Sequence, residues 1–404
     1  MSYKSLRKIY YTDAQNFESE YQRRFNSPST RHFEIDIKEY NRSKAFPSFI
    51  CYTEEMALLT EKIYKRFSSF RQIKDSVPEL LLRQFVLSSL VDEIQSSNDI
   101  EGVYSTKKQI RSVLENNIDD KKALHLRSLV DKYERIISHK TIPFESCQDI
   151  RNFYDTFVLD EVLSEHPDNK PDGKIFRKDQ VSVESQTGKI FHQGVYPEDI
   201  LIETMAKALA ILHSESIPAF VKIGVFHYLF GYMHPFYDGN GRTSRFITSY
   251  YLAEELDEII ALRLSVIIKK HKNNYYKLFQ EANSEFNRGD LTPFITAFFN
   301  LLLSSLDDTI QVLSRKKAQL VSYYEKLKAK VQCDKVTLDI YYILLQAGFF
   351  YGEGVTIKQI KEQLQKSRVT IQNRINALPE SHININKNTK PYRYKLNMAI
   401  FKNK

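Results

Sequence analysis

His234-Pro-Phe-Tyr-Asp238-Gly-Asn-Gly-Arg242-Thr-Ser-Arg245 is the stretch on which the interpretation of the whole chain depends. It combines an imidazole, a carboxylate, two glycines and two guanidiniums within about three helical turns. The residues before it, Ile217 to Met233, have the apolar spacing of a buried helix, with Ser216 as its N-cap. The residues after it, Thr243 to Leu256, resume a helical pattern. The sequence therefore predicts a tight loop over 238–242 that leads into a helix N-terminus.

The residue types in this loop suit phosphate chemistry. A neutral His234 can accept a proton from an attacking hydroxyl, since the ordinary pKa of imidazole is about 6.5. Asp238 offers the hard oxygen that Mg²⁺ prefers when it bridges phosphates. The glycines on either side of Asn240 let backbone N–H groups converge on an anion, and the two arginines that follow match phosphate oxygens. A histidine alone is usually structural and DGNG alone is usually a turn, but the combination favours a phosphate site.

The stretch resembles the signature of the Fic (filamentation induced by cAMP) family, HPFx[D/E]GNGRxxR, and matches it at every fixed position. Most members of that family transfer AMP from ATP to a hydroxyl side chain of a target protein and release pyrophosphate. The resemblance implies that His234 is the general base, that Asp238 holds Mg²⁺ and that Arg245 reaches the terminal phosphate. It also implies a phosphate cradle made of Gly239, Asn240, Gly241 and Arg242.

A second match lies upstream, at Ser97-Asn-Asp-Ile-Glu101-Gly102, on a helix predicted to begin near Glu79. It resembles the inhibitory motif of the family, [S/T]xxxE[G/N]. A carboxylate at Glu101 could pair with Arg245 and take the place of the γ-phosphate. The simpler alternative is a surface hydroxyl and a solvated carboxylate on an ordinary helix. Because the motif precedes the catalytic stretch, the chain resembles the class that carries its own N-terminal inhibitory helix.

Two further stretches extend the resemblance. Residues 173–183 are similar to the β-hairpin flap of the family, and the alternation of Val181 and Val183 continues at Ile190 after a turn at Gly188. The edge of such a flap could hold a target loop by strand addition. The alternative is an ordinary surface hairpin.

The other stretch, Tyr275 to Asn283, is similar to the helix that lines the adenine pocket in some relatives. On that resemblance, Tyr276 and Phe279 offer apolar surface and Asn283 offers an amide to the edge of the base. Aromatic residues at this spacing also occur in a plain core, so that alternative stays open.

Residues 335–404 are a second informative part of the chain. Helical patterns over 338–347, 356–364 and 369–378 are followed by two alternating strands around 383–385 and 392–396. Ser367 is the predicted cap of the third helix. This order of elements resembles a winged helix-turn-helix.

The charge of this tail is uneven, with twelve Lys or Arg residues and four Asp or Glu residues, an excess equal to the net charge of +8 of the whole chain. Polar residues of the third helix could meet base edges, and cations of the hairpin could meet phosphates. The predicted base-contacting residues are Thr370, Gln372, Asn373 and Arg374. DNA is therefore one predicted partner, while a protein-docking module and a solvated basic face stay open.

The predicted fold is mainly α: a Fic-type helical bundle with a small β-hairpin flap, plus a C-terminal winged helix-turn-helix (α+β) domain. We expect five parts: an irregular N-terminal arm (1–45), a helical region with the inhibitory motif (46–130), a Fic catalytic core (131–313), a linker helix (314–334) and the winged helix-turn-helix domain (335–404). The 404 residues leave room for two or three domains with a sizeable core.

Composition points to a reducing compartment and to no membrane. Cys51, Cys147 and Cys333 are odd in number, far apart and without metal-binding spacing, which favours the cytoplasm. Residues 1–15 lack the apolar run of a signal peptide, and no other run approaches the length of a membrane span. The resemblance adds a homodimer as one expected assembly.

Three functions compete at this point. The favoured one is an autoinhibited protein adenylyltransferase that uses ATP and Mg²⁺ and modifies a protein substrate, the chain itself included. The second keeps the fold but uses another donor, or removes AMP with Glu101 positioning a water. The third is a DNA-binding regulator that works through its tail, with the Fic core as a nucleotide sensor.

Overall fold

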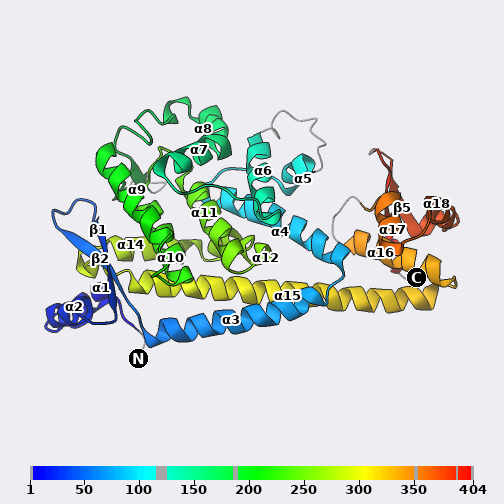
Figure 1. The fold of residues 1–404 in the computed structure, drawn as a ribbon, viewed down its shortest axis with the longest axis horizontal. Coiled ribbons are helices and arrows are strands. Elements are labelled where there is room, and N and C mark those ends of the chain that lie inside the picture. Colours follow the sequence, from blue (N-terminus) through cyan, green and yellow to red (C-terminus); the bar gives the residue numbers. More distant parts are fainter. Residues whose placement is uncertain (1–2, 115–124, 185–189, 350–353, 388–389, 402–404) are drawn as a thin grey trace. The chain divides into compact units, whose positions relative to one another are not determined.

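The computed structural model describes residues 3–114, 125–184, 190–349, 354–387 and 390–401 (Figure 1). Within these residues the chain is mainly helical, with three separate pairs of antiparallel strands, which confirms the predicted mainly α class. The chain divides into two compact units, one formed by 1–67 with 90–306 and the other by 68–89 with 307–404. Three helices run across this division: α3 (Glu54–Asp75), α4 (Glu79–Glu101) and α15 (Thr292–Lys330).

The first unit holds most of the helices and two strand pairs. Its helices in chain order are α1 (Leu6–Thr12), α2 (Phe17–Phe25), α5 (Lys107–Leu114), α6 (His125–Ile137), α7 (Cys147–Phe157), α8 (Leu159–Glu165), α9 (Glu198–Leu212), α10 (Ala219–Met233), α11 (Asn240–Glu255), α12 (Glu258–Ala261), α13 (Leu264–Lys270) and α14 (Lys272–Asn283). Its strands are β1 (Thr30–Lys38), β2 (Ala45–Cys51), β3 (Ser182–Glu184) and β4 (Ile190–Gln193). Short 3-10 turns cover Pro167–Asn169 and Glu285–Asn287.

Helix α10 is the central helix of the first unit. It is buried on all its faces and packs against α9, α11 and α14. A helix with no polar stripe is expected to be enclosed in this way. It begins at Ala219 with Pro218 as N-cap, so the predicted start at Ile217 and the predicted cap Ser216 are wrong. The reason is steric, because a residue that precedes proline is disfavoured in the helical conformation.

Helix α11 begins three residues earlier than predicted. Its N-cap is Gly239, in the left-handed region with φ of 73°, and Asn240 is already its first residue. The predicted loop over 238–242 therefore ends at Gly239, and Gly241 and Arg242 lie in the first helical turn. The apolar pattern used for the prediction starts only at Phe246, because the first turn of this helix carries no aliphatic or aromatic side chain.

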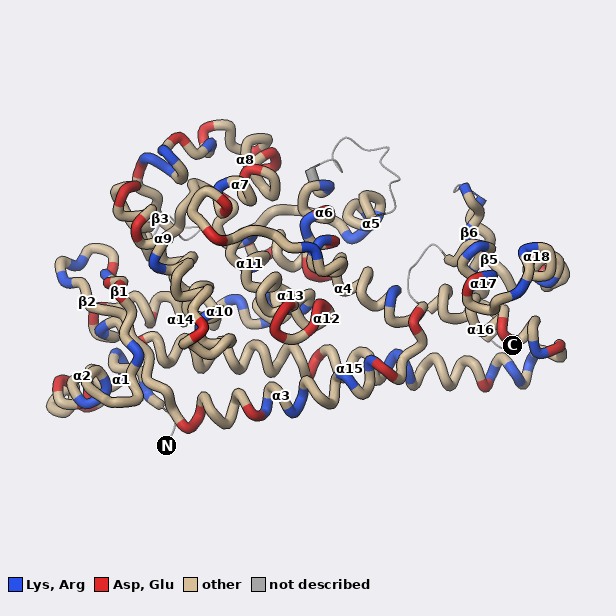
Figure 2. The backbone as a smooth tube through the Cα atoms, viewed as in Figure 1, with Lys and Arg blue, Asp and Glu red and all other residues tan. Residues whose placement is uncertain are grey.

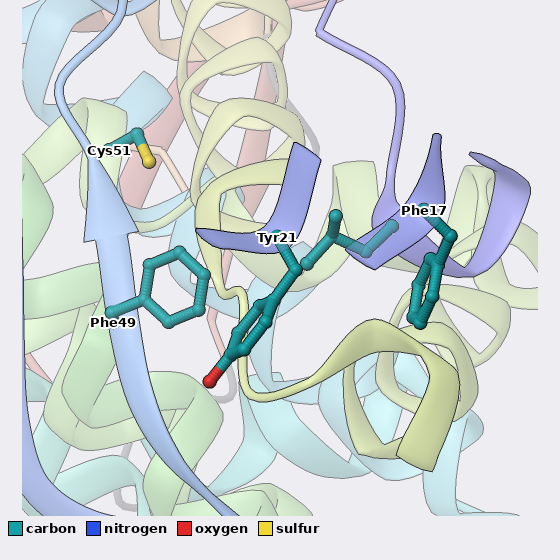
Figure 3. Close-up of a cluster of buried hydrophobic side chains, with 5 residues drawn as sticks. Phe17, Tyr21, Phe49 and Cys51 are labelled. Carbon is teal, nitrogen blue, oxygen red and sulfur yellow. The ribbon is translucent and has the colours of Figure 1, made fainter. Parts of the chain in front are cut away.

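The expectation of an irregular arm over 1–45 is wrong. Helices α1 and α2 pack against β2, and their apolar side chains form one buried cluster around Phe17, Tyr21 and Phe49 (Figure 3). Strand β1 pairs antiparallel with β2. Its residues Phe33, Ile35 and Ile37 are buried and alternate with exposed polar ones, which is the pattern of a half-buried strand. Because this segment carries many charged residues, the alternation of buried and exposed positions is not evident from its sequence.

The predicted flap contains a strand pair. Ser182 of β3 lies opposite Gln193 of β4, and Val183 lies opposite His192. Residues 173–181 precede the strand and are not part of it. The turn predicted at Gly188 lies outside the described residues.

The linker helix predicted over 314–334 is, as far as Lys330, the C-terminal part of α15, which runs without interruption for 39 residues. Neither glycine nor proline occurs between Leu306 and Ser314, so nothing in the sequence ends the helix there. The end of the predicted core and most of the predicted linker helix are thus stretches of one helix.

The tail contains three helices followed by an antiparallel pair of strands, in the predicted order. They are α16 (Lys335–Phe349), α17 (Ile357–Leu364), α18 (Arg368–Asn376), β5 (Ile383–Asn386) and β6 (Arg393–Leu396), with 3-10 turns at Glu380–His382 and Met398–Phe401. Ser367 caps α18, as predicted, by accepting a hydrogen bond from the Thr370 N–H at 3.1 Å. Lys and Arg are prominent on α18 and on the hairpin (Figure 2). The last cations of the sequence, Lys402 and Lys404, lie outside the described residues.

Across the described ranges, every helix falls short of the length or the apolarity that a membrane crossing demands.

Candidate active site

The site is built where α10 ends and α11 begins. His234 follows the last residue of α10 and adopts a left-handed conformation, with φ of 49° and ψ of 63°. Its N–H still donates to the Phe230 carbonyl at 3.0 Å, so the chain turns sharply while the helix end stays closed. This conformation is unusual for a residue other than glycine, and it directs the chain away from the helix axis at the imidazole.

The hydrogen bond of the His234 ring fixes its tautomer. Nδ1 lies 3.2 Å from the Gly231 carbonyl oxygen, which can only accept, so Nδ1 carries the proton. Within the described chain no hydrogen bond to Nε2 is found, and in the neutral ring this nitrogen holds a free lone pair. Burial lowers the pKa of His234 below its ordinary value, which the nearby carboxylates Glu101 and Asp238 only partly offset. The imidazole is therefore neutral at pH 7 and able to accept a proton.

The loop between His234 and α11 is held by side chains from its own ends. Asn240 receives a hydrogen bond from the Phe236 N–H at 2.9 Å and donates one to the Phe236 carbonyl at 2.7 Å. The Phe236 ring stacks on Tyr154, with centroids 3.6 Å apart, and the Tyr154 hydroxyl donates to the Asp238 carbonyl at 3.1 Å. The side chain of Asn240, predicted to cradle phosphate, is thus engaged in shaping the loop.

The first turn of α11 presents free backbone donors. Gly239 has no side chain, and among the residues that the structure describes no side-chain cap occupies the N–H groups of residues 240–242. Beside them, Arg242 is 1% exposed and its Nη1 donates to Glu161 of α8 at 2.6 Å. This buried carboxylate fixes the guanidinium next to the helix N-terminus, where an anion would also benefit from the helix dipole.

Asp238 is the carboxylate of this loop. Its Oδ1 accepts the Gly239 N–H and lies 3.9 Å from Arg242 Nη2, and the side chain is 34% exposed. In the described part of the chain no group of three or more His, Cys, Asp or Glu side chains forms a metal site. A single half-exposed carboxylate fits Mg²⁺ that takes its other ligands from phosphates and water. Asp238 can therefore hold Mg²⁺ together with a nucleotide.

Arg245, one turn further along α11, is bound by α4. Its Nη1 donates to Glu101 Oε1 at 2.7 Å, its Nε to Ser97 Oγ at 3.1 Å and its Nη2 to the Ser97 carbonyl at 2.9 Å. All three nitrogens of the guanidinium thus contact one helix, and the side chain is 2% exposed. The structure brings the two predicted motifs together, and Gly102 with φ of 81° follows directly after α4.

The environment keeps Glu101 ionised. Burial alone would raise the pKa of this carboxyl, but the charge and the hydrogen bond of Arg245 outweigh burial, with help from Arg242 and His234, and the pKa is lowered. Gly241 makes room for the pair, because a Cβ at this position would collide with the Glu101 carboxylate and would lie 2.8 Å from Arg245 Nη1. The carboxylate therefore occupies space directly above the first turn of α11.

The two residues predicted for a base pocket lie at different depths. Tyr276 is 39% exposed, and its hydroxyl lies 3.5 Å from the Ile100 carbonyl of α4. Asn283 is 6% exposed; its amide oxygen accepts from the Tyr228 hydroxyl at 2.7 Å, and its amide nitrogen lies 3.3 Å from His192 Nδ1. Tyr276 thus borders the inhibitory helix. Asn283 joins α14 to α10 and β4, and its direct contact with a base stays a prediction.

Sequence reasoning assigned no role to two residues that shape the site. Glu161, which holds Arg242, lies 81 positions away from it in a stretch without any distinctive pattern. Arg177 was part of the predicted flap, but nothing in its neighbourhood indicated that its side chain reaches the His234 loop. Both contacts depend on long-range packing.

Comparisons with known proteins agree with this geometry. A sequence model described as the Fic/DOC family matches residues 146–252, which contain the whole stretch from His234 to Arg245. The chain is 26% identical over 255 residues to "Protein adenylyltransferase Fic" of Aedes aegypti, covering 62% of this chain and 48% of that protein. It is 28% identical over 233 residues to the Drosophila yakuba protein of the same name, covering 56% and 43%. The chain spans about half the length of these curated relatives.

The fold is shared with a solved structure. A crystal structure of a Fic family protein from Desulfovibrio desulfuricans G20 covers 86% of this chain and 97% of its own, with a TM-score of 0.53 at 19% sequence identity. The signature stretch, the family match and this shared fold agree. Residues 146–252 of the chain therefore resemble the Fic/DOC family.

Proposed function

We propose that this chain is a protein adenylyltransferase that moves AMP from ATP to a hydroxyl side chain of a protein, and that α4 holds it in an inhibited state. The observation that carries the proposal is the meeting of a neutral imidazole, two buried arginines and an uncapped helix N-terminus where α10 ends and α11 begins. The name of the curated relatives supports the same chemistry. A homodimer and a cytoplasmic location stay predictions.

The proposed reaction is an in-line displacement at phosphorus. His234 Nε2 takes the proton of the substrate hydroxyl while its oxygen forms a bond to the α-phosphorus of ATP. The bond between that phosphorus and the oxygen bridging to the β-phosphate breaks, and its electron pair leaves with pyrophosphate. The carbonyl of Gly231 stabilises the imidazolium through Nδ1–H, and His234 then returns the proton to water.

The chain's own residues supply the phosphate contacts in this proposal. The N–H groups of residues 240–242 and the guanidinium of Arg242 face the α- and β-phosphates, and Arg245 faces the γ-phosphate. Mg²⁺ held by Asp238 would neutralise phosphate charge when it is bound. Tyr276 offers its ring to the base.

The inhibited state follows from the contacts of Arg245. In this structure each of its three nitrogens donates to Ser97 or Glu101, so these two residues compete with a γ-phosphate for the guanidinium. The Glu101 carboxylate also adds a like charge beside Gly241, where a phosphate would approach. ATP would bind weakly, or in a pose unsuited to in-line attack.

Labelled ATP tests the reaction. The full chain carrying Glu101→Gly is incubated with Mg²⁺ and ATP labelled at either the α- or the γ-phosphate. Label is expected on protein from the α position and not from the γ position. Arrival of the γ label would identify phosphoryl transfer and would contradict the proposal. The same preparation, offered other α-labelled nucleotides or AMP-modified protein, separates adenylyl transfer from another donor or from removal of AMP.

The tail supports a second candidate function, the binding of DNA. A cleft of about 640 Å³ lies between α17, α18 and β6. The exposed ring of Tyr392 lines this cleft together with four cations. These cations are Lys358, Lys361, Arg368 and Lys390. Such a cleft suits a phosphate backbone. Arg374, predicted to meet a base edge, is instead paired with Asp334 at 2.6 Å, so phosphate contacts carry this proposal.

Gel-shift titration of the full chain tests the tail. Changing the cleft cations Lys358, Lys361 and Arg368 together to Gln should weaken duplex binding and lower the slope of log affinity against log salt by roughly one per lost phosphate contact. The matched control removes the same charge from exposed residues of the other unit, by changing Lys4, Arg7 and Lys8 to Gln. Equal effects of the two triple variants would show a diffuse charge effect and would end the proposal of a cleft.

A further inference from the structure

Arg177 is a buried cation that bonds to backbone alone. The side chain is 1% exposed, and in the described part of the chain no salt bridge is found for it. Its Nε donates to the His234 carbonyl at 2.8 Å and its Nη1 to the Asp179 carbonyl at 2.7 Å. Its Nη2 donates to the Val195 carbonyl at 2.8 Å and to the Met233 carbonyl at 3.2 Å. Four carbonyls from three segments thus share one guanidinium.

These segments belong to two sides of the candidate active site, the flap region and the end of α10. Met233 and His234 end α10 and carry the proposed base. Val195 follows β4, and its N–H donates to the Met233 carbonyl at 3.0 Å, while the Arg177 N–H donates to the Pro235 carbonyl at 3.3 Å. Arg177 therefore sits at the junction of the flap with the His234 loop.

The chemistry at this junction of the flap and the His234 loop favours an arginine. The last carbonyls of a helix have no partner within it and carry partial negative charge, so a cation there is favourable. A guanidinium has five N–H groups in one plane and can serve several carbonyls at once, whereas an ammonium concentrates its donors on one atom. Gly194 is part of the same arrangement, because a Cβ there would collide with Arg177 Nη2 and would lie 2.8 Å from the Met233 carbonyl.

We propose that Arg177 is a positioning residue for the reaction: it joins the base of the flap to the backbone of His234 and thereby sets where the imidazole stands relative to a substrate hydroxyl held by the flap. This inference rests on the proposed function. Arg177 touches no reacting atom, and its effect passes through the carbonyls of Met233 and His234.

The kinetic test is made in the active Glu101→Gly background. Arg177→Lys is expected to lower kcat by roughly 10- to 100-fold, since a displaced base costs rate steeply. The KM for ATP should stay within about threefold, because the guanidinium contacts no phosphate donor. Methylguanidinium in the buffer should restore part of the rate of Arg177→Ala. Arg151→Lys is the matched control: Arg151 Nη1 donates to the Ile175 carbonyl at 2.8 Å nearby but does not reach the His234 loop.

Hydrogen exchange provides a readout that needs no activity. In the full chain, Arg177→Lys should speed exchange both at residues 190–195 and at residues 231–236, whereas Arg151→Lys should not. If the Glu101→Gly parent transfers no AMP, the proposed function fails, and exchange alone decides whether Arg177 joins the two segments. If the parent is active, the inference is overturned by either of two results. One is an unchanged kcat in Arg177→Lys, and the other is a fall in kcat that Arg151→Lys shows to the same extent.

Discussion

Replacing Glu101 with glycine is expected to raise the rate of self-modification by roughly 5- to 150-fold, the range that corresponds to a coupling free energy of about 1–3 kcal/mol. The change removes the carboxylate that holds Arg245 Nη1 at 2.7 Å and frees that nitrogen for a γ-phosphate. Ser97 still binds the other two nitrogens, so the variant with both Ser97→Ala and Glu101→Gly should be faster again. Incorporation of α-labelled AMP measures the rate, and calorimetry measures the accompanying gain in ATP affinity.

Asp99→Gly is the matched control for this experiment. Asp99 lies in the same turn of α4 and pairs with Lys269 at the surface, so its loss loosens the helix to a similar degree without touching Arg245. Activation by Glu101→Gly and not by Asp99→Gly would assign the effect to the carboxylate. Equal activation by both would mean that helix fraying, rather than competition for Arg245, controls the enzyme.

Replacing His234 with alanine in the Glu101→Gly background is expected to lower kcat by roughly 10²- to 10⁴-fold, the usual contribution of a positioned general base. Binding of ATP should persist, because the phosphate contacts come from α11 rather than from the imidazole. Calorimetry of ATP binding therefore serves as the control for folding. Loss of binding together with loss of rate would contradict the assigned role.

The pH dependence of the same reaction has a defined direction. A protonated imidazole cannot accept the hydroxyl proton, so the rate falls as pH falls through the pKa of His234. Because burial lowers that pKa, the fall should come below the ordinary value of about 6.5, and the rate should be level across neutral pH. A midpoint above 7 would contradict a buried neutral base.

The sequence predicted the site best where its residues are consecutive. His234, Asp238 and Arg245 lie on one short segment, and the order of a buried helix, a loop and a second helix brings them together without further information. The meeting of Glu101 with Arg245, 144 positions apart, was accessible only through the family motif. The hydrogen bonds of Glu161 and Arg177 were not predictable, because each depends on how distant helices pack.

The fold was predicted well in its helices and less well at their ends. The start of α11 was placed at Thr243, where apolar spacing resumes, whereas the cap at Gly239 sets the true start. The sequence predicts an irregular N-terminal arm because Glu34 and Asp36 mask the buried alternation of Phe33, Ile35 and Ile37. The boundary predicted between residues 313 and 314 falls inside α15, because no residue there ends the helix.

The pairing of the buried Arg245 with Glu101 has a consequence for how a cell could control this protein. The Arg245 side chain is 2% exposed and the Glu101 side chain 24%, so salt screens this ion pair only in part. Because the pKa of Glu101 is lowered, the pair persists at every pH above the ordinary range of a carboxyl and is lost only in stronger acid. Mild acidification would therefore not release the inhibitory contact. An activating signal must instead move the C-terminal end of α4 away from Arg245, as a binding partner or a covalent change on that helix can.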